Sequence, residues 1–192
     1  WLDRAPRIRM RKVDSRRVRY LTCEQAKNLL NELPEHQRNI AEFALLTGLR
    51  QRNILQLTWS QIDMKNAIAW IHPDQSKTRK AISVPLNQRA MELLHSMYGI
   101  HSEYVFTYKG NPMKQANTKA WRNALKRAGI EDFRWHDLRH TWATWHIQNG
   151  TPPHVLQELG GWSSYEMVRR YAHLSTNHLK TYSNNALIYE TT

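Results

Sequence analysis

The sequence predicts a mainly helical domain that carries a small antiparallel β-sheet, an α+β fold. Three observations support this: apolar residues recur at helical spacing, two strand-like runs flank a polar turn, and 41% of the 192 residues are apolar. That length suffices for one hydrophobic core with small appendages, but not for two large domains. We therefore expect a basic linker or arm at residues 1–19, one main domain at residues 20–173, and a C-terminal tail at residues 174–192.

Helices are indicated where apolar spacing lies between capping, glycine and proline signals. Thr22-Cys-Glu-Gln25 fits a capping box before the first helix, and an apolar run over residues 40–46 follows Pro34. Gly48 ends that pattern, and another helix is expected from about Gln51. Further helical patterns cover residues 87–97, 115–128, 136–148, 153–159 and 164–171.

Strands are indicated in only a few places. Residues 67–71 and 81–85 have strand-like composition, and the polar turn at residues 74–80 joins them as a small hairpin. Residues 104–108 offer another strand.

The chain is strongly basic. Lys and Arg number 28 against 16 Asp and Glu, a formal charge of +12, which favours a nucleic acid, an anionic membrane or an acidic protein as partner. Ordinary solubilising charge is the alternative. No apolar run approaches the roughly 20 residues of a membrane span, and no signal peptide is evident. We expect a soluble intracellular protein.

Two further observations bear on context. Cys23 is the only cysteine, which excludes an internal disulfide framework and fits a reducing compartment. The chain begins at Trp1 rather than Met. We interpret it as a fragment or processed form, with a missing N-terminal domain as one explanation.

The first candidate site is Thr47-Gly-Leu-Arg50, where an arginine follows the end of a helix. The backbone, rather than a flexible stem, would position an arginine at such a junction. That suits a phosphate clamp, although Arg50 could also be a solvated surface charge.

The second candidate site is Trp135-His-Asp-Leu-Arg-His140, within a predicted helix. A core stripe of Leu138, Trp142 and Trp145 leaves His136, Arg139 and His140 on the other face. An arginine guanidinium can donate two hydrogen bonds to phosphate oxygens at once, and histidine can transfer a proton near neutral pH. This grouping therefore suits phosphoryl chemistry.

The same segment has a rival interpretation as a zinc site. His136-Asp-Leu-Arg-His140 mimics the His-Glu-x-x-His helix of zinc hydrolases. Asp137 is one methylene shorter than that glutamate, Arg139 would bring a positive charge to the metal-binding face, and no third ligand motif is obvious. We keep the zinc hydrolase as an alternative.

The third candidate site follows Leu159-Gly-Gly-Trp-Ser-Ser164. Ser163 and Glu166 can form a capping box, which would place Tyr171 late in a short helix. Most tyrosines are packing residues with a hydrated hydroxyl, so composition alone does not single out Tyr171.

In order along the chain, these motifs resemble the tyrosine recombinase family, the phage integrases, over about residues 20–182. Thr47-Gly-Leu-Arg50 resembles the first catalytic arginine motif, and Ser76-Lys77-Thr78 resembles the lysine motif. His136-Asp-Leu-Arg-His140 is similar to the box that contains the histidine and the second arginine. Tyr171-Ala-His173 resembles the nucleophile box. The resemblance implies the fold of a recombinase catalytic domain over residues 20–173.

The sequence departs from the family pattern at two places. Leu159-Gly-Gly-Trp162 stands where Leu-Gly-His is usual, with one inserted glycine and tryptophan in place of histidine. Asn53 stands three residues after the first arginine, where the family commonly has an acidic residue. This second departure leaves open how Arg50 is supported.

The resemblance implies a strand transfer through a covalent protein–DNA bond. Tyr171 would attack the scissile phosphate, leaving a 3′-phosphotyrosyl link and a free 5′-hydroxyl, and the reverse step with another strand would complete the exchange. Arg50 and Arg139 would stabilise the phosphate charge. No ATP, metal or other cofactor is implied.

The remaining site residues have implied or candidate roles. His136 is the natural candidate to accept the tyrosine proton, because a phenol has an ordinary pKa of about 10. Lys77 would protonate the departing 5′-oxygen. Trp162 can only donate a hydrogen bond through its indole N–H, and His140 either supports the site or is structural.

The implied partners are double-stranded DNA, other recombinase subunits in a tetrameric synapse, and accessory DNA-bending proteins. The expected location is the cytoplasm of a bacterial host, at the nucleoid, with no membrane association. The tail at residues 174–192 would pack in cis or dock in trans on a neighbouring subunit. A non-catalytic helix-turn-helix module from residue 115 onward is another alternative, but it would not explain Arg50, Lys77 and Tyr171.

Overall fold

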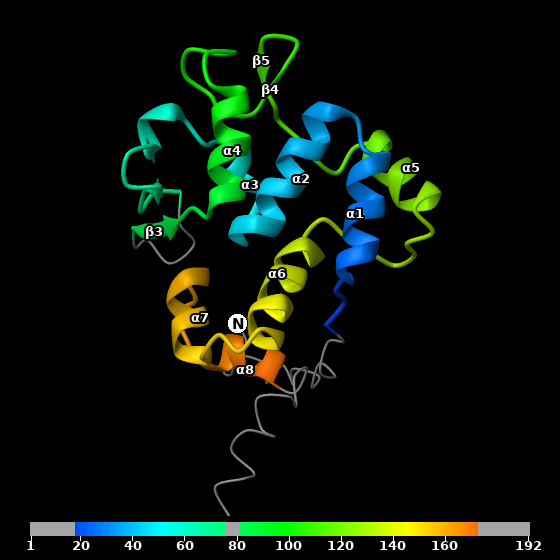
Figure 1. Cartoon of the computed structure of the whole chain (residues 1–192), viewed down its shortest axis with the longest axis vertical. Helices are drawn as coiled ribbons and strands as arrows, with labels where there is room; N and C mark the ends of the chain where they lie inside the picture. The colour runs from blue at the N-terminus through cyan, green and yellow to red at the C-terminus, as the bar shows by residue number, and fades with distance from the viewer. Residues whose placement is uncertain (1–17, 76–80, 173–192) are drawn as a thin grey trace, which may run out of the picture.

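The computed structural model describes residues 18–75 and 81–172 (Figure 1). Residues 1–17 of the predicted arm, Lys77 of the lysine motif and the tail from residue 173 lie outside the described residues. The described helices are α1 (Cys23–Glu32), α2 (Glu35–Thr47), α3 (Gln51–Leu55), the short 3₁₀ helix η1 (Trp59–Gln61), α4 (Gln88–Met97), α5 (Lys119–Arg127), α6 (Asp137–Gln148), α7 (Pro153–Gly160) and α8 (Glu166–Ala172). None of these helices is long and apolar enough to cross a lipid bilayer.

The helix boundaries follow local hydrogen bonding. The capping box predicted before α1 is confirmed: the Thr22 side chain accepts from the Gln25 backbone, and the Gln25 side chain accepts from the Thr22 backbone. The start predicted for α5 at residue 115 is wrong, because Thr118 caps that helix and accepts from the Trp121 N–H. The capping box predicted at Ser163 is also wrong, because α8 begins only at Glu166.

The main sheet is antiparallel and has the strand order β1–β2–β3. Its strands are β1 (Ile62–Asp63), β2 (Ile68–Ile71) and β3 (Ile82–Pro85). Strands β2 and β3 form the predicted hairpin, with Ile71 opposite Ile82. Strand β1 was not predicted, because it has only two residues and no alternating pattern. Within residues 104–108 only Thr107–Tyr108 forms a strand, β4, which pairs with β5 (Asn111–Pro112).

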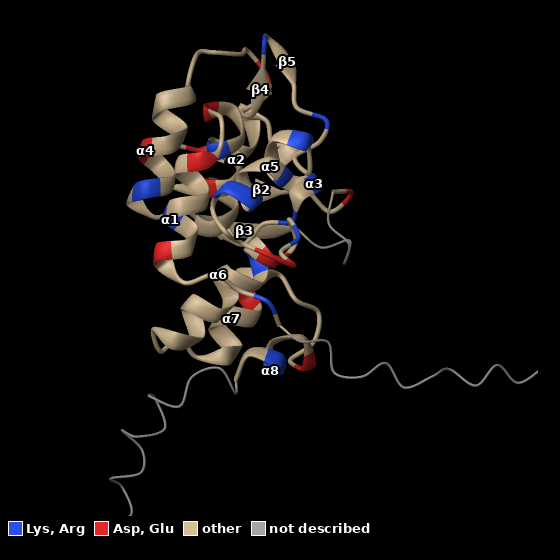
Figure 2. Cartoon of the chain, turned by 90° about the vertical axis from the view of Figure 1, so that its right-hand side faces the viewer, with Lys and Arg blue, Asp and Glu red and all other residues tan. Residues whose placement is uncertain are grey.

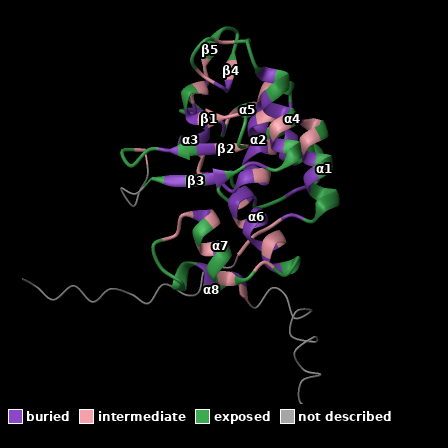
Figure 3. Cartoon of the chain, turned by 60° about the vertical axis from the view of Figure 1, so that its left-hand side comes forward, coloured by how far each residue is buried: buried purple, intermediate pink, exposed green. Residues whose placement is uncertain are grey.

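Two apolar clusters hold the described residues together. The main core lies among α1–α5, the sheet and the start of α6. A smaller one, which we call the C-terminal cluster, lies among α6, α7 and α8. Its buried members are Trp142, Ala143, Ile147, Leu156, Val168 and Tyr171. Helix α6 lies between the elements of the main core and the α7–α8 pair, and it is buried over much of its length (Figures 1 and 3).

Candidate active site

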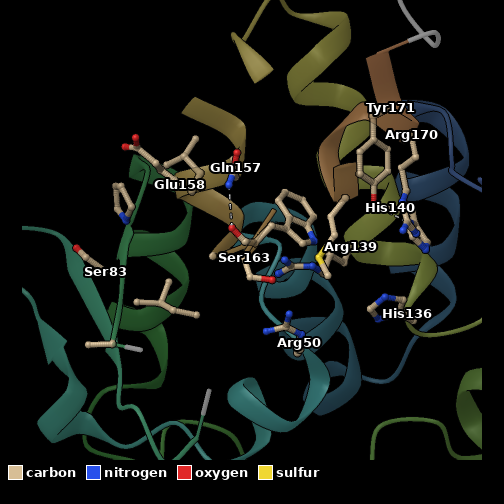
Figure 4. Close-up of a pocket in the computed structure, with 17 residues that line it drawn as sticks. Arg50, Ser83, His136, Arg139, His140, Gln157, Glu158, Ser163, Arg170 and Tyr171 are labelled. Carbon is tan, nitrogen blue, oxygen red and sulfur yellow. Dashed lines mark hydrogen bonds between the residues drawn. The ribbon is translucent and has the colours of Figure 1, made fainter. Parts of the chain in front are cut away.

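One cavity of about 1070 Å³ lies between β3, α6, α7 and α8, and the start of α3 also lines it (Figure 4). It brings together five of the six catalytic residues that the sequence predicted, and the sixth, Lys77, lies outside the described residues. The five are Arg50, His136, Arg139, Trp162 and Tyr171. His140, predicted as a supporting residue, lines the same cavity. Residues from five separate parts of the chain thus converge on one space.

Arg50 enters the cavity from the turn between α2 and α3. Gly48 ends α2 in the left-handed region at a φ of 64°, and its N–H bonds the Ala44 carbonyl. A β-carbon at Gly48 would lie 2.2 Å from a ring carbon of Trp142, so only glycine fits. Arg50 then takes the N-cap position of α3. The turn between the two helices therefore fixes the position of the Arg50 backbone, as predicted.

Arg139 is held more tightly than any other charged group of the cavity. Only 5% of the residue is exposed. Its Nη1 donates to the Gly48 carbonyl at 2.6 Å and its Nη2 to the Gly160 carbonyl at 2.5 Å. The Trp162 ring lies over the guanidinium, with 4.3 Å between its centroid and the guanidinium carbon. The ends of α2 and α7 therefore orient this side chain.

The positive charge of Arg139 has no carboxylate partner within ion-pair distance among the described residues. Burial lowers its pKa to about 9, and the charge of Arg50 acts in the same direction. The guanidinium still remains protonated at neutral pH. A buried cation that bonds only neutral carbonyls is costly unless an anion joins it. The cavity is therefore electrostatically suited to an anion.

Tyr171 lies in α8 and is 2% exposed. Its ring packs between His140 and Trp162, at centroid distances of 5.7 and 5.9 Å. Its hydroxyl lies 2.6 Å from Nδ1 of His140. Burial raises the pKa of Tyr171 to about 12, while the charges of Arg139 and Arg170 oppose that rise. The phenol is therefore neutral and protonated in the isolated domain.

The two histidines differ in their relation to Tyr171. His136 was the predicted proton acceptor, but the hydrogen-bond partner of the Tyr171 hydroxyl is His140. Burial lowers the pKa of His140 to about 4, and the nearby His136, Arg170 and Arg139 add to this. Burial and the charge of Arg139 also lower the pKa of His136. Both imidazoles are therefore neutral at physiological pH.

Arg170 also lines the cavity, and the sequence analysis did not single it out. It comes from α8, next to Tyr171, and Figure 4 shows it near His140. The adjacent basic pair Arg169 and Arg170 before the tyrosine was the available signal. Arg169 instead lies 3.7 Å from Glu166.

The glycine pair before Trp162 accounts for the first departure from the family pattern. Gly161 ends α7 in the left-handed region, at a φ of 58°. A β-carbon at Gly160 would lie 2.1 Å from a ring carbon of Trp162. The turn therefore favours glycine at position 161, and the Trp162 ring leaves no room for a β-carbon at position 160. The Trp162 ring packs against Arg139, a contact that the sequence did not predict. The predicted role of its N–H as a hydrogen-bond donor is a separate matter.

Asn53, the second departure, acts through the neighbouring hairpin. Only 3% of Asn53 is exposed, and its side-chain N–H donates to the Gln75 carbonyl at 2.9 Å. Gln61 also donates to the Gln75 side chain at 2.8 Å. Gln75 is the last described residue before the segment that contains Lys77. Asn53 therefore ties the helix that follows Arg50 to the entry of the lysine segment.

The zinc alternative rested on His136 and His140. Their rings meet edge to face, with centroids 5.0 Å apart. Within residues 18–75 and 81–172, no group of three or more His, Cys, Asp or Glu side chains is placed to hold a metal ion. The second of the two histidines bonds the Tyr171 hydroxyl instead.

The chain is similar to known proteins over most of its length. The phage integrase family matches residues 19–178. The chain is 52% identical over 191 residues to the integrase of Salmonella phage P22, an alignment that covers 93% of this chain and 49% of that protein. The chain thus spans about half the length of this curated relative.

Two solved structures have a similar fold. The catalytic domain of bacteriophage HP1 integrase matches with a TM-score of 0.68 and 26% identity, covering 90% of this chain and 97% of that one. The Tn1549 transposon integrase in complex with a circular intermediate DNA matches with a TM-score of 0.75. At 18% identity, covering 91% of this chain and 68% of that one, it shows the fold alone. The fold is that of a tyrosine recombinase catalytic domain, as predicted, and the chain belongs to the phage integrase family.

Proposed function

We propose that this chain is the catalytic domain of a site-specific DNA recombinase that cuts and rejoins strands through Tyr171. The observation that carries the proposal is one cavity in which the Tyr171 hydroxyl bonds His140 while Arg50 and Arg139 line the same space. The phenol oxygen forms a bond to the scissile phosphorus, and the bond from phosphorus to the 5′-oxygen breaks. A 3′-phosphotyrosyl link and a 5′-hydroxyl result.

The arginines stabilise the phosphate during this exchange. Their guanidinium groups are placed before the substrate arrives, so little reorganisation opposes the charge that develops on the non-bridging oxygens. One phosphate ester replaces another, so no ATP is consumed. We propose that cleavage proceeds without a metal ion, because Arg50 and Arg139 supply the positive charge.

We propose that the proton of Tyr171 passes to Nδ1 of His140, and that Lys77 protonates the departing 5′-oxygen. The transfer from Tyr171 is unfavourable in the isolated domain, since the pKa of the phenol is raised to about 12 and that of the imidazole lowered to about 4. An incoming phosphate favours an imidazolium beside it. Binding of DNA thus favours transfer of the Tyr171 proton to His140 and activates the tyrosine as a nucleophile.

His136 and Trp162 complete the proposed site. His136 lines the same cavity at the N-terminus of α6 and serves as a hydrogen-bonding group to phosphate. Trp162 stacks on Arg139 and keeps its guanidinium in place. This changes the role expected for Trp162 from donor to positioning residue.

The proposed partners are duplex DNA and other recombinase subunits. The Tn1549 transposon integrase, of similar fold, is known in complex with DNA. Exchange between two duplexes requires four cleaved strands, which is the basis for a tetrameric synapse. Accessory DNA-bending proteins and a bacterial nucleoid location belong to the same proposal. A DNA-binding module without chemistry would account for the charge, but not for a buried tyrosine bonded to a histidine.

The test is covalent trapping on a nicked suicide duplex, where loss of the short 5′ fragment prevents rejoining. The unmodified chain should form an adduct in EDTA, whereas Tyr171→Phe should form none and bind DNA as before. Tyr165→Phe is the control, because Tyr165 is 50% exposed and lies just before the same helix. An adduct with Tyr171→Phe would overturn the choice of nucleophile.

The second arm of the test compares the histidines. His140→Ala should slow adduct formation at every pH from 6 to 9 without weakening DNA binding, because it removes the acceptor of the phenol proton. His136→Ala should retain a larger share of the rate. A reversed order would return the proton-accepting role to His136.

A further inference from the structure

A second cavity, of about 520 Å³, lies near the β4–β5 hairpin, at the opposite end of the molecule from α7 and α8 (Figure 1). We call it the α5 pocket, because the N-terminal residues of α5 form part of its wall. The residues that matter here are His36, Tyr108, Lys114, Gln115, Thr118 and Lys119. None of them belongs to the proposed catalytic set.

The α5 pocket is positively charged. Lys114 and Lys119 are exposed, no acidic residue lines the pocket, and neither lysine belongs to an ion pair among the described residues. Lys109 Nζ lies 5.5 Å from the ring centroid of Tyr108, which is a lining residue. Lysine, glutamine, asparagine and threonine side chains are common ligands of DNA backbone oxygens. The lining thus offers donors to an anion and no competing carboxylate.

The wall of the α5 pocket is fixed by hydrogen bonds. Gln37, only 1% exposed, donates to the Thr118 hydroxyl at 2.5 Å and to the Ala116 carbonyl at 3.4 Å. The Thr118 oxygen also accepts from the Trp121 N–H and so caps α5. On the far wall, the rings of His36 and Tyr108 stack with centroids 4.0 Å apart. The two lysines therefore project from a rigid base.

The same base reaches the catalytic cavity. With its amide oxygen turned toward the segment before α5, Gln51 accepts from the backbone N–H groups of Ala116 and Asn117, both at 3.3 Å. Gln51 directly follows Arg50. Figure 2 shows Lys and Arg positions on the side of the molecule that carries the β4–β5 hairpin, α5 and α3. The α5 pocket and Arg50 are thus presented by adjoining backbone.

We propose that the α5 pocket binds a backbone phosphate of the same duplex, away from the scissile phosphate, through Lys114 and Lys119. The inference rests on the proposed function only in taking duplex DNA as the partner. A second fixed phosphate sets the rotation and register of the duplex, and so determines which phosphate reaches Arg50 and Tyr171. The pocket reads no bases, since phosphate contacts position DNA without specifying sequence.

The test measures binding without chemistry, in the full chain carrying Tyr171→Phe. Lys114→Gln with Lys119→Gln should weaken binding to all duplexes alike. It should also reduce the log–log salt slope by about one, because one phosphate contact is lost. The matched control is Lys27→Gln with Lys126→Gln, which removes the same charge from exposed sites on α1 and the last turn of α5. Its salt slope should change little.

A methylphosphonate scan of the duplex locates the contact. One neutral phosphate away from the cleavage site should weaken binding of the parent protein but not that of the Lys114→Gln, Lys119→Gln protein. If no such position exists, or if the control loses as much slope, diffuse charge explains the binding and the proposal is wrong. Unchanged DNA binding with loss of multi-subunit complexes would instead assign the pocket to a protein partner.

Covalent trapping on the suicide duplex separates this proposal from the proposed function. Suppose that the unmodified chain forms an adduct but that the lysine substitutions leave the salt slope unchanged. The proposal for the α5 pocket would then be wrong, and the role of Tyr171 would stand. A slope that depends on the lysines, with no adduct on any duplex, would do the reverse.

Discussion

The main core and the C-terminal cluster divide the proposed chemistry unequally. The main core packs α1–α5 with the sheet and contains a large set of buried apolar side chains. The C-terminal cluster relies on a few side chains of α6, α7 and α8, and Tyr171 is itself one of them. Local opening costs least where few apolar contacts are buried. Within the described residues, we therefore expect the part that contains the nucleophile to open more readily than the part that contains Arg50.

Arg139 and Gly48 form the seam between these two parts. Arg139 bonds Gly48 at the end of α2 and Gly160 at the end of α7. Trp142, a member of the C-terminal cluster, fills the space beside Gly48. The buried charge thus connects the two clusters, and an anion bound to it would stabilise the assembled site.

Breaking the seam at Gly48 should have the largest effect on stability. Gly48→Ala places a β-carbon 2.2 Å from Trp142 at a φ of 64°. Strain and overpacking together should cost about 3 kcal/mol of unfolding free energy, measured by urea denaturation.

Gly129→Ala is the control for Gly48→Ala. Gly129 has a similar φ of 66° with nothing within 4 Å of a β-carbon, so only the backbone strain of about 1 kcal/mol should appear. Equal losses for the two variants would mean that Trp142 does not pack against Gly48.

Replacing the planar guanidinium of Arg139 by an ammonium should separate the effect of charge from the effect of geometry. Arg139→Lys keeps the positive charge, but one ammonium cannot reproduce the planar pair of bonds to Gly48 and Gly160. Adduct formation on the suicide duplex should slow by about 100-fold. Affinity for the same duplex, measured by fluorescence anisotropy, should change little. A rate within threefold of the parent would show that charge alone is enough.

Two valines compare the clusters directly. Val84 lies in the main core and Val168 in the C-terminal cluster, at 2% and 0% exposure. Val84→Ala should lower global stability by ~2 kcal/mol. Val168→Ala should instead speed hydrogen exchange in α8 and slow cleavage, with a smaller change in global stability. Identical exchange profiles would show that the two clusters unfold as one unit.

The sequence predicted most elements whose signal is local. Helical spacing located most helices, and Thr22 and Gln25 predicted the start of α1. Arg50 and Arg139 could be proposed as site residues for the same reason, because each lies in a short local motif and arginine is the residue type that suits a phosphate. The start of α5 was predicted too early although its cap is local: Thr118 accepts from the backbone N–H of Trp121, and the distant Gln37 only adds a bond to the same hydroxyl.

The relation between His140 and Tyr171 lay beyond the sequence. These residues are 31 positions apart and meet only because α8 folds back onto α6. Position within the motif favoured His136, which is the first histidine of its box. The stacking of Trp162 on Arg139 likewise depends on Gly160 and on the turn that ends α7.

The finest distinction between the two parts of the site is the protonation of His140. It faces His136 at the N-cap of α6, Arg139 of α6, and Arg170 and Tyr171 of α8, while burial lowers its pKa from an ordinary value of 6.5 to about 4. The folded state thus binds this proton more weakly than the unfolded state. The contribution of His140 to stability should therefore be complete above pH 6.5 and decline as pH falls toward 4.

NMR titration of the His140 ring nitrogens in the Tyr171→Phe protein measures this directly, without interference from cleavage. The midpoint should lie well below 6.5, because burial, and not the tyrosine hydroxyl, is the main cause of the shift. Adding duplex should raise the midpoint, since a phosphate in the cavity stabilises the imidazolium. A midpoint near 6.5 in the free protein would mean that α8 does not cover His140 in solution. A midpoint that DNA leaves unchanged would place the phosphate elsewhere and remove the reason for assigning the proton to His140.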